Sequence, residues 1–115
     1  MHVTRYAEAK PYDAPNHFGV TSLRLQGAEA SPARSFWCGV SRVLPGGGAK
    51  HGAAPLERMY LVLKGEVTVT TAEGETVLRP MDSCLIGANE ARLLENRSKA
   101  PAIIVVVMEN PKASA

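Results

Sequence analysis

The chain has 115 residues, of which 45% are hydrophobic and 21% are charged, and its formal net charge at pH 7 is +2. This length provides for one domain with one core and excludes a second domain. The basic residues are scattered and the longest apolar run, 102–108, is far shorter than the ~20 residues of a membrane helix, while no signal-peptide core opens the chain. We therefore predict a cytoplasmic protein without a nucleic-acid or membrane partner.

The chain begins with a polar arm. Residues 1–16 contain Pro11 and Pro15, which predicts little structure of their own, although such an arm can also supply an edge strand or an exchanged strand. His17 follows the arm and is expected on the surface. At the other end of the chain, residues 111–115 are expected to form a flexible end.

Between these ends, residues 17–110 are typical of one all-β domain with little helix. Apolar residues come in short β-branched or aromatic bursts, most of them separated by Gly, Pro, Asn or Asp, and no window keeps the apolar spacing of a helix. Such a chain favours a closed or two-sheet antiparallel barrel, because closure hides the edges of the strands. The expected strands are 20–25, 36–44, 59–63, 66–71, 76–78, 83–86, 92–94 and 102–108.

Two local features are interpreted as structural. Residues 44–51 include the tract Gly46–Gly48 but lack the spacing and the following helix of a phosphate-binding loop, so we interpret them as a flexible connection at the mouth of the barrel. Cys38 and Cys84 lie within apolar bursts, which is typical of free buried thiols in a reducing compartment.

Two stretches of the chain resemble the cupins, which are small jelly-roll β-barrels. His51 and Gly65 match positions of the first cupin motif, G-x5-H-x-H-x3-4-E-x6-G. Gly87 and Asn96 match positions of the second motif, G-x5-P-x-G-x2-H-x3-N. The resemblance covers residues 36–108 and implies a cupin jelly-roll barrel of two antiparallel sheets. It also implies a homodimer, which is common among small cupins.

The departures from these motifs concern the metal ion that cupins usually hold inside the barrel. Ala53 stands where the family has its second histidine and Arg92 where it has its third, so only His51 remains. A guanidinium does not ligate a metal ion and repels a divalent cation. We therefore expect no metal cofactor at the usual place.

The acid position of the first motif falls on Glu57 or on Arg58, depending on the end from which the spacing is counted. Residues two apart in a strand share a face, so Arg58 is expected to point inward with Tyr60, and Glu57 to point outward. An alternative keeps a metal ion on His51 and Glu57, and it requires a β-bulge that turns Glu57 inward.

Arginines inside a barrel suggest the kind of ligand. A guanidinium forms charge-assisted, bidentate hydrogen bonds with carboxylates and phosphates. We therefore predict that the barrel binds a small organic anion and that the protein is a metal-independent lyase, isomerase or decarboxylase of small-molecule metabolism. Two alternatives remain open, a non-catalytic ligand-binding module and a metal-dependent dioxygenase or isomerase.

The predicted site divides into catalytic and ligand-binding residues. His51 would move a proton, and Tyr60 would donate a hydrogen bond or a proton. Structural roles compete with these: Arg92 could belong to a surface charge ladder, and Trp37 and Cys84 could simply pack in the core. The predicted catalytic residues are His51, Tyr60 and Arg92, and the predicted ligand-binding residues are Arg58, Glu57, Trp37, Cys84 and Asn96.

Overall fold

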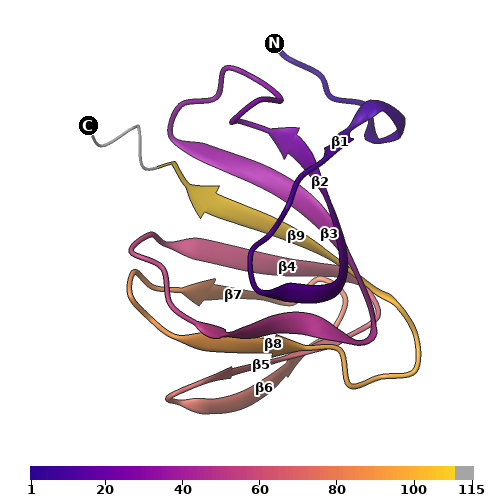
Figure 1. The fold of residues 1–115 in the computed structure, drawn as a ribbon, viewed down its shortest axis with the longest axis vertical. Helices are drawn as coiled ribbons and strands as arrows, with labels where there is room; N and C mark the ends of the chain where they lie inside the picture. The colour runs from indigo at the N-terminus through magenta and orange to yellow at the C-terminus, as the bar shows by residue number, and fades with distance from the viewer. Residues whose placement is uncertain (111–115) are drawn as a thin grey trace.

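The computed structural model describes residues 1–110, and residues 111–115, for which the sequence predicts a flexible end, lie outside the described residues. Within residues 1–110, one short 3-10 helix, η1 (Tyr6–Glu8), precedes nine strands (Figure 1). The all-β prediction is therefore confirmed. The strands are β1 (Lys10–Pro11), β2 (His17–Gln26), β3 (Phe36–Gly52), β4 (Arg58–Lys64), β5 (Val67–Thr71), β6 (Gly74–Leu78), β7 (Ser83–Ile86), β8 (Arg92–Glu95) and β9 (Ala102–Glu109).

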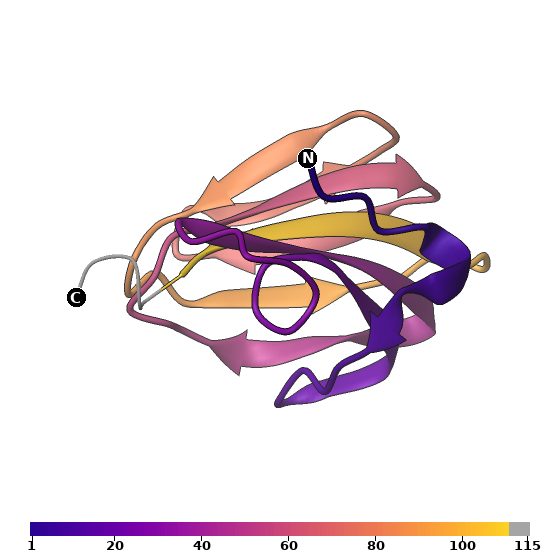
Figure 2. The ribbon, with the colours of Figure 1, turned by 90° about the horizontal axis from the view of Figure 1, so that it is seen from above.

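The strands form two facing layers that the long strand β3 joins (Figures 1 and 2). The order along the main path is β6-β5-β8-β3-β9-β4-β7, with β2 also paired to β3 and β1 to β2. The first part of β3 pairs with β9, Phe36 opposite Glu109, whereas its last part pairs with β8, Gly48 opposite Glu95. All these pairs are antiparallel, as expected for a jelly-roll barrel.

The interpretation of residues 44–51 as a flexible connection is wrong. These residues are part of β3, which pairs with β2 and β8 along them. Glycine is needed there because the strands approach closely: a Cβ on Gly48 would overlap the carbonyl oxygen of Leu94, and one on Gly47 would lie 2.6 Å from the carbonyl oxygen of Gly19. The tract therefore contributes close packing between strands rather than flexibility.

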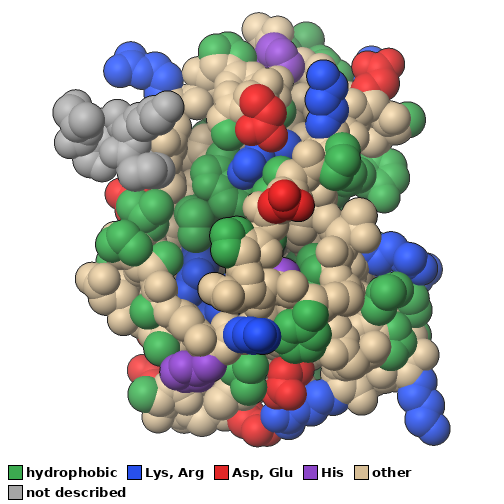
Figure 3. Space-filling model, viewed as in Figure 1, with side chains coloured by type: hydrophobic (Ala, Val, Ile, Leu, Met, Phe, Trp, Pro, Cys, Tyr) green, Lys and Arg blue, Asp and Glu red, His purple; other side chains and the backbone are tan. Residues whose placement is uncertain are grey.

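The core fills one end of the space between the layers. It consists of buried side chains from β3 to β9, which are Val43, Ala49, Tyr60, Val62, Val67, Val69, Leu78, Ile86, Leu94, Ala102 and Ile104. Strand alternation places these residues inward, with the more exposed positions between them. Figure 3 shows the outer surface, on which basic and acidic side chains of the visible face are interspersed.

The N-terminal arm follows β2 and then crosses toward the end of β3. β1 pairs with β2 of the same chain, Lys10 opposite Arg24. Beyond β1, the Tyr12 amide donates to the Ser22 carbonyl oxygen at 3.0 Å, and the Lys50 amide donates to the Asn16 carbonyl oxygen at 2.9 Å. The arm is thus hydrogen-bonded to the barrel at both ends of the segment 12–16. The predicted homodimer stays a prediction.

No helix within residues 1–110 has the length and apolar character needed to cross a membrane.

Candidate functional site

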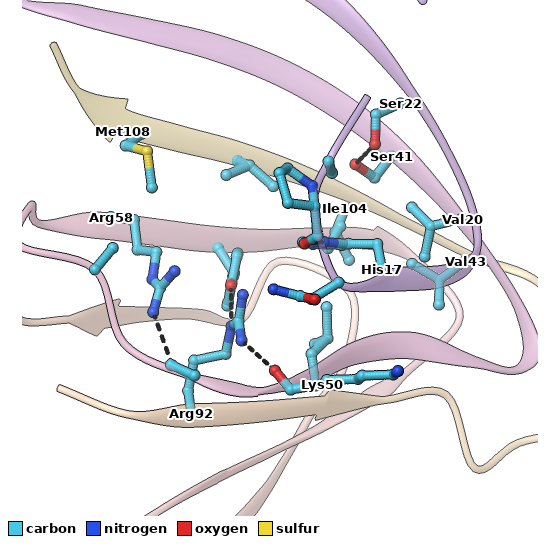
Figure 4. A pocket seen from close by; sticks show the side chains of 18 of the residues that line it. His17, Val20, Ser22, Ser41, Val43, Lys50, Arg58, Arg92, Ile104 and Met108 are labelled. Atoms are coloured by element: carbon cyan, nitrogen blue, oxygen red, sulfur yellow. Dashed lines mark hydrogen bonds between the residues drawn. The ribbon is translucent and has the colours of Figure 1, made fainter. Parts of the chain in front are cut away.

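A cavity of about 470 Å³ lies between the two layers, at the end of the barrel that the core leaves unfilled. The arm provides one wall through residues 12–17, and strands β2, β3, β4, β8 and β9, together with Ala53 and Ala54 between β3 and β4, provide the rest. Its volume is typical of small-molecule pockets, which range over about 300–1,000 Å³. Side chains of the lining are shown in Figure 4, in which His17, Arg58 and Arg92 enter from three different elements.

Arg92 projects into the cavity from β8, and its side chain is held on two sides. Its Nε donates to the Tyr60 hydroxyl at 2.7 Å, and its Nη1 donates to the Lys50 carbonyl oxygen at 2.9 Å (Figure 4). These bonds use only two of the five N–H groups of a guanidinium. Because only 6% of Arg92 is exposed, the surface-ladder alternative is wrong. Tyr60 accepts a hydrogen bond from Arg92, so its own hydroxyl proton remains available for a ligand.

Arg58 is the second buried guanidinium of the cavity and has fewer partners. Its Nη2 donates to the Gly52 carbonyl oxygen over 3.4 Å, and its Nε is buried without a hydrogen-bond partner within residues 1–110. Burial lowers the pKa of the Arg58 guanidinium, Tyr60 raises it, and the charge of Arg92 lowers it. A buried N–H without an acceptor lowers the stability of the fold by about 1–3 kcal/mol, so it is uncommon in a folded protein. Such an N–H is expected where a bound ligand supplies the acceptor.

Glu57 lies on the opposite side of the chain from Arg58, as strand alternation predicts. It is exposed, its backbone N–H donates to the Glu109 carboxylate at 3.3 Å, and it lies outside the cavity lining. β4 begins at Arg58 in regular pairing with β7 and β9. The bulge that would turn Glu57 inward is therefore not found at the start of β4 in the described chain.

His17 lines the cavity, although the sequence places it on the surface. It is half-buried at the start of β2, and its Nδ1 lies 2.8 Å from the Pro15 carbonyl oxygen. Burial lowers the pKa of His17, Pro15 raises it, and the positive charges of Arg92 and Arg58 lower it further. The imidazole is therefore neutral at pH 7. No local motif signals this role, because it depends on the arm returning across the barrel.

His51 also lines the cavity, near the end of β3, but it is exposed. The sequence-predicted residues His51, Tyr60, Arg92, Arg58 and Trp37 are thus brought together around one cavity, whereas Glu57, Cys84 and Asn96 lie outside its lining.

Trp37 and Tyr12 are aromatic residues of the cavity lining. Their rings meet edge to face with centroids 5.4 Å apart, and the Arg24 guanidinium carbon lies 3.9 Å from the Tyr12 centroid and 4.5 Å from that of Trp37. Burial raises the pKa of the Tyr12 hydroxyl, and hydrogen bonding to Ser22 and Ser41 lowers it. Sequence reasoning missed Tyr12, because it lies in the arm.

Cys84 lies opposite Tyr60 in the β4–β7 pair and packs against the core. Both Cys38 and Cys84 are free and half-buried, and burial raises the pKa of each thiol.

Asn96 stabilises the loop between β8 and β9. Its side chain is 1% exposed, and its Nδ2 donates to the Val43 carbonyl oxygen at 3.0 Å and to that of Ala100 at 2.8 Å, while its Oδ1 accepts from the Ser98 amide and hydroxyl. These contacts are within the protein, so a structural role accounts for this residue.

Replacing Asn96 by alanine is therefore expected to destabilise the fold by roughly 2–4 kcal/mol, since it leaves buried carbonyl groups without donors. Urea unfolding followed by circular dichroism measures this change. Lys99→Ala, at an exposed position of the same loop, is the matched control and should leave the free energy of unfolding unchanged; equal effects of the two substitutions would contradict the assignment.

The residues present do not fit the metal ion that the cupin resemblance implies. Within residues 1–110, no three His, Cys, Asp or Glu side chains gather into a group that could hold an ion. Ala53 and Arg92, which the resemblance aligns with two family histidines, both line the cavity, and Arg58 adds a second guanidinium to it. Two positive charges repel a divalent cation. The side chains of this cavity therefore suit an anion better than a divalent metal ion.

Comparisons with known proteins agree with this fold. The family model for the cupin domain matches residues 39–108. A Mycobacterium tuberculosis protein named beta-D-galactosidase is 40% identical over 113 residues, which cover 98% of this chain and 97% of that protein.

Solved structures show the same architecture in proteins of several activities. A sugar phosphate isomerase of the cupin superfamily from Silicibacter pomeroyi matches with a TM-score of 0.70 and 26% identity, over 80% of this chain and 60% of that one. A polyketide cyclase from Streptomyces resistomycificus matches with a TM-score of 0.83 and 17% identity, over 95% and 79% of the two chains. The family match spans most of the chain and the barrel is the one these structures share, so the chain belongs to the cupin family.

Proposed function

We propose that the barrel binds a small organic anion between Arg58 and Arg92 and that the protein catalyses a proton transfer on this anion, as in an isomerase, lyase or decarboxylase. The observation that carries the proposal is the Arg58 Nε, a buried N–H without a partner in the described chain, in the same cavity as Arg92. A carboxylate or phosphate oxygen supplies the acceptor that this N–H lacks.

The charge of the cavity favours an anion. Arg58, Arg92 and Lys50 line it, whereas Asp13 is the only Asp or Glu of its lining within residues 1–110. Arg24 also lines the cavity, but its charge is paired with Glu29 at 3.1 Å. The two buried guanidiniums repel each other until a negative charge is placed between them, which favours binding of an anion over a neutral analogue.

The remainder of the cavity suits a hydroxylated ring. Trp37 and Tyr12 offer aromatic surface, and the hydroxyl groups of Ser22 and Ser41, 2.8 Å apart, offer hydrogen bonds. Two of the relatives carry names that refer to sugars, a sugar phosphate isomerase and a beta-D-galactosidase. A sugar acid or a sugar phosphate has both a negative charge and a hydroxylated ring, so we propose this class of ligand.

The proposed chemistry requires a proton donor and a proton acceptor beside the anion. Tyr60 receives a hydrogen bond from Arg92 and can donate its own proton to an oxygen of the ligand. Two histidines, His17 and His51, line the cavity and supply an imidazole. A module that only binds its ligand would be stabilised by it without consuming it, so turnover separates the enzyme from the binding protein.

Calorimetric titration with D-galacturonate, D-galactose 6-phosphate and D-galactose tests the anion site, because the last compound has the same ring without the charge. We expect the two anions to bind and the neutral sugar to bind at least tenfold more weakly. Replacing Arg92 by glutamine should weaken anion binding about 10- to 100-fold, the value of one or two charge-assisted hydrogen bonds. Equal binding of galactose and galacturonate, or unchanged affinity in Arg92→Gln, would overturn the proposal.

Hydrolysis of galactosides is a second candidate, favoured by the 40% identity to the beta-D-galactosidase. Most glycosidases use two carboxyl groups on either side of the bond that breaks. Asp13 is the acid available in the cavity lining. Release of nitrophenol from nitrophenyl β-D-galactopyranoside that is lost in Asp13→Asn would support this candidate, whereas the anion proposal predicts no such activity.

A further inference from the structure

We propose that His17 is the proton acceptor of the cavity and that its protonation is coupled to the binding of an anion at Arg58 and Arg92. This inference rests on the proposed function, and it assigns to the N-terminal arm a catalytic group that the cupin motifs do not contain. In this proposal His51, which belongs to the motif, is not the base.

The position of His17 is fixed by the arm and by β3. Asn16 has a left-handed backbone, with φ of 61°, that turns the chain before β2 begins. The Asn16 carbonyl oxygen accepts from the Lys50 amide at 2.9 Å, and His17 pairs with Ala49. Lys50 in turn accepts from Arg92 through its own carbonyl oxygen at 2.9 Å. One residue of β3 therefore connects the segment of His17 with the guanidinium of Arg92.

The contact with Pro15 defines which nitrogen of His17 can accept a proton. A backbone carbonyl oxygen only accepts hydrogen bonds, so the Nδ1 that lies 2.8 Å from it carries the hydrogen. In the neutral ring this leaves the lone pair on Nε2. His51 has no side-chain hydrogen bond that fixes its ring within residues 1–110, and it is more exposed.

The charges around His17 explain how its protonation depends on the ligand. Arg92 on β8, Arg58 on β4, Lys50 on β3 and the Glu29-paired Arg24 on β2 line the same cavity. Within residues 1–110, Asp13 of the arm is the carboxylate of this lining and His51 its second imidazole. Burial and the two guanidinium charges lower the pKa of His17, so the ring is neutral and able to accept a proton near pH 7. A bound anion offsets those positive charges and so raises the pKa of His17.

The step that follows is an abstraction of a proton next to a carbonyl group of the bound anion. The C–H bond breaks, an N–H bond forms at Nε2 of His17, and the electron pair of the C–H bond stays on the ligand as an enolate. The enolate oxygen accepts a hydrogen bond from the Tyr60 hydroxyl, which Arg92 polarises. Where the carbon that loses the proton carries a hydroxyl group, the Tyr60 hydroxyl gives its proton to the enolate oxygen and takes the proton of that hydroxyl group, whose oxygen becomes the new carbonyl oxygen. His17 then returns its proton to the former carbonyl carbon, which completes an isomerisation and leaves both side chains as they began.

Nitrogen-15 NMR of the histidine side chains tests this inference, with signals assigned by His17→Gln and His51→Gln. We expect His17 to show the Nδ1–H tautomer and to have a pKa below the ordinary value of an imidazole. In Arg92→Gln without any ligand, the titration of His17 should move to higher pH, because one positive charge is gone. A pKa of His17 at or above the ordinary value, or one that Arg92→Gln does not affect, would overturn the inference.

Adding D-galacturonate to the wild-type protein separates this inference from the proposed function. If the anion binds at the arginines, the titration of His17 moves to higher pH, as it does in Arg92→Gln. If His17 responds to Arg92→Gln but calorimetry finds no binding of galacturonate or galactose 6-phosphate, the coupling within the cavity stands and the proposed ligand class is wrong. If the anions bind and His17 does not respond, the proposed function stands and His17 is not the coupled proton acceptor.

Discussion

Replacing Arg58 by methionine is expected to raise the stability of the ligand-free protein and to abolish its binding of small anions. Arg58 is 7% exposed, its only hydrogen bond is 3.4 Å long, and its Nε has no partner in the described chain. Burying a poorly paired charge costs several kcal/mol, and apolar replacement of buried charges can stabilise a protein by about 1–4 kcal/mol. Methionine is unbranched like the aliphatic part of arginine, carries no charge and adapts to irregular space.

Two measurements on the same variant check this prediction: chemical unfolding for stability and calorimetric titration with galacturonate for binding. Arg79→Met is the matched control, because Arg79 is exposed and its ion pair with Glu66 is loose, at 3.6 Å. The control should change neither quantity. If Arg58→Met instead lowers the free energy of unfolding, as truncation of a core residue does, Arg58 has a structural role. The proposal that Arg58 recognises the anion would then be contradicted.

Replacing Gly48 by alanine is expected to destabilise the barrel by about 3 kcal/mol or more, or to prevent folding. A Cβ at this position would overlap the Leu94 carbonyl oxygen and lie 3.1 Å from the Glu95 Cα. These are backbone atoms of the paired strand β8, so no side-chain rotation relieves the overlap. The β3–β8 pairing that joins the two layers would have to separate.

Urea unfolding, with yield of folded protein as a second readout, measures the effect of Gly48→Ala. Gly87→Ala is the matched control, because a Cβ there would meet only the Glu90 carboxylate oxygen at 3.7 Å, an ordinary contact. The control is expected to stay within about 1 kcal/mol of the wild type. Similar stability of both variants would show that β3 and β8 do not approach as closely as described.

The strands were predictable because their signals are local. The burst at 59–63 becomes β4 (Arg58–Lys64), and the burst at 102–108 becomes β9 (Ala102–Glu109), with shifts of a residue at the ends. Alternation also predicts Arg58 and Tyr60 on the same face of β4, and both line the cavity. Trp37 lines the cavity and Phe36 is exposed.

The parts that sequence reasoning missed depend on contacts between distant segments. Nothing near Gly48 indicates that β8 lies against it, so the glycine tract looked like a connection. Tyr12 and His17 belong to a segment whose own residues favour no structure. Their place in the cavity depends on the hydrogen bond from the Tyr12 amide to Ser22 and on the one from the Lys50 amide to Asn16, the neighbour of His17. Such long-range pairing leaves no periodic pattern in a single sequence.

A crystal structure of the protein with D-galacturonate, or with galactose 6-phosphate if that binds more tightly, tests the central claim most directly. We expect oxygens of the carboxylate or phosphate to lie within hydrogen-bond distance of the Arg58 Nε and of a free N–H of Arg92, with the ring beside Trp37. Density for the anion elsewhere on the surface would contradict the account, and so would a metal ion coordinated between His51 and Glu57.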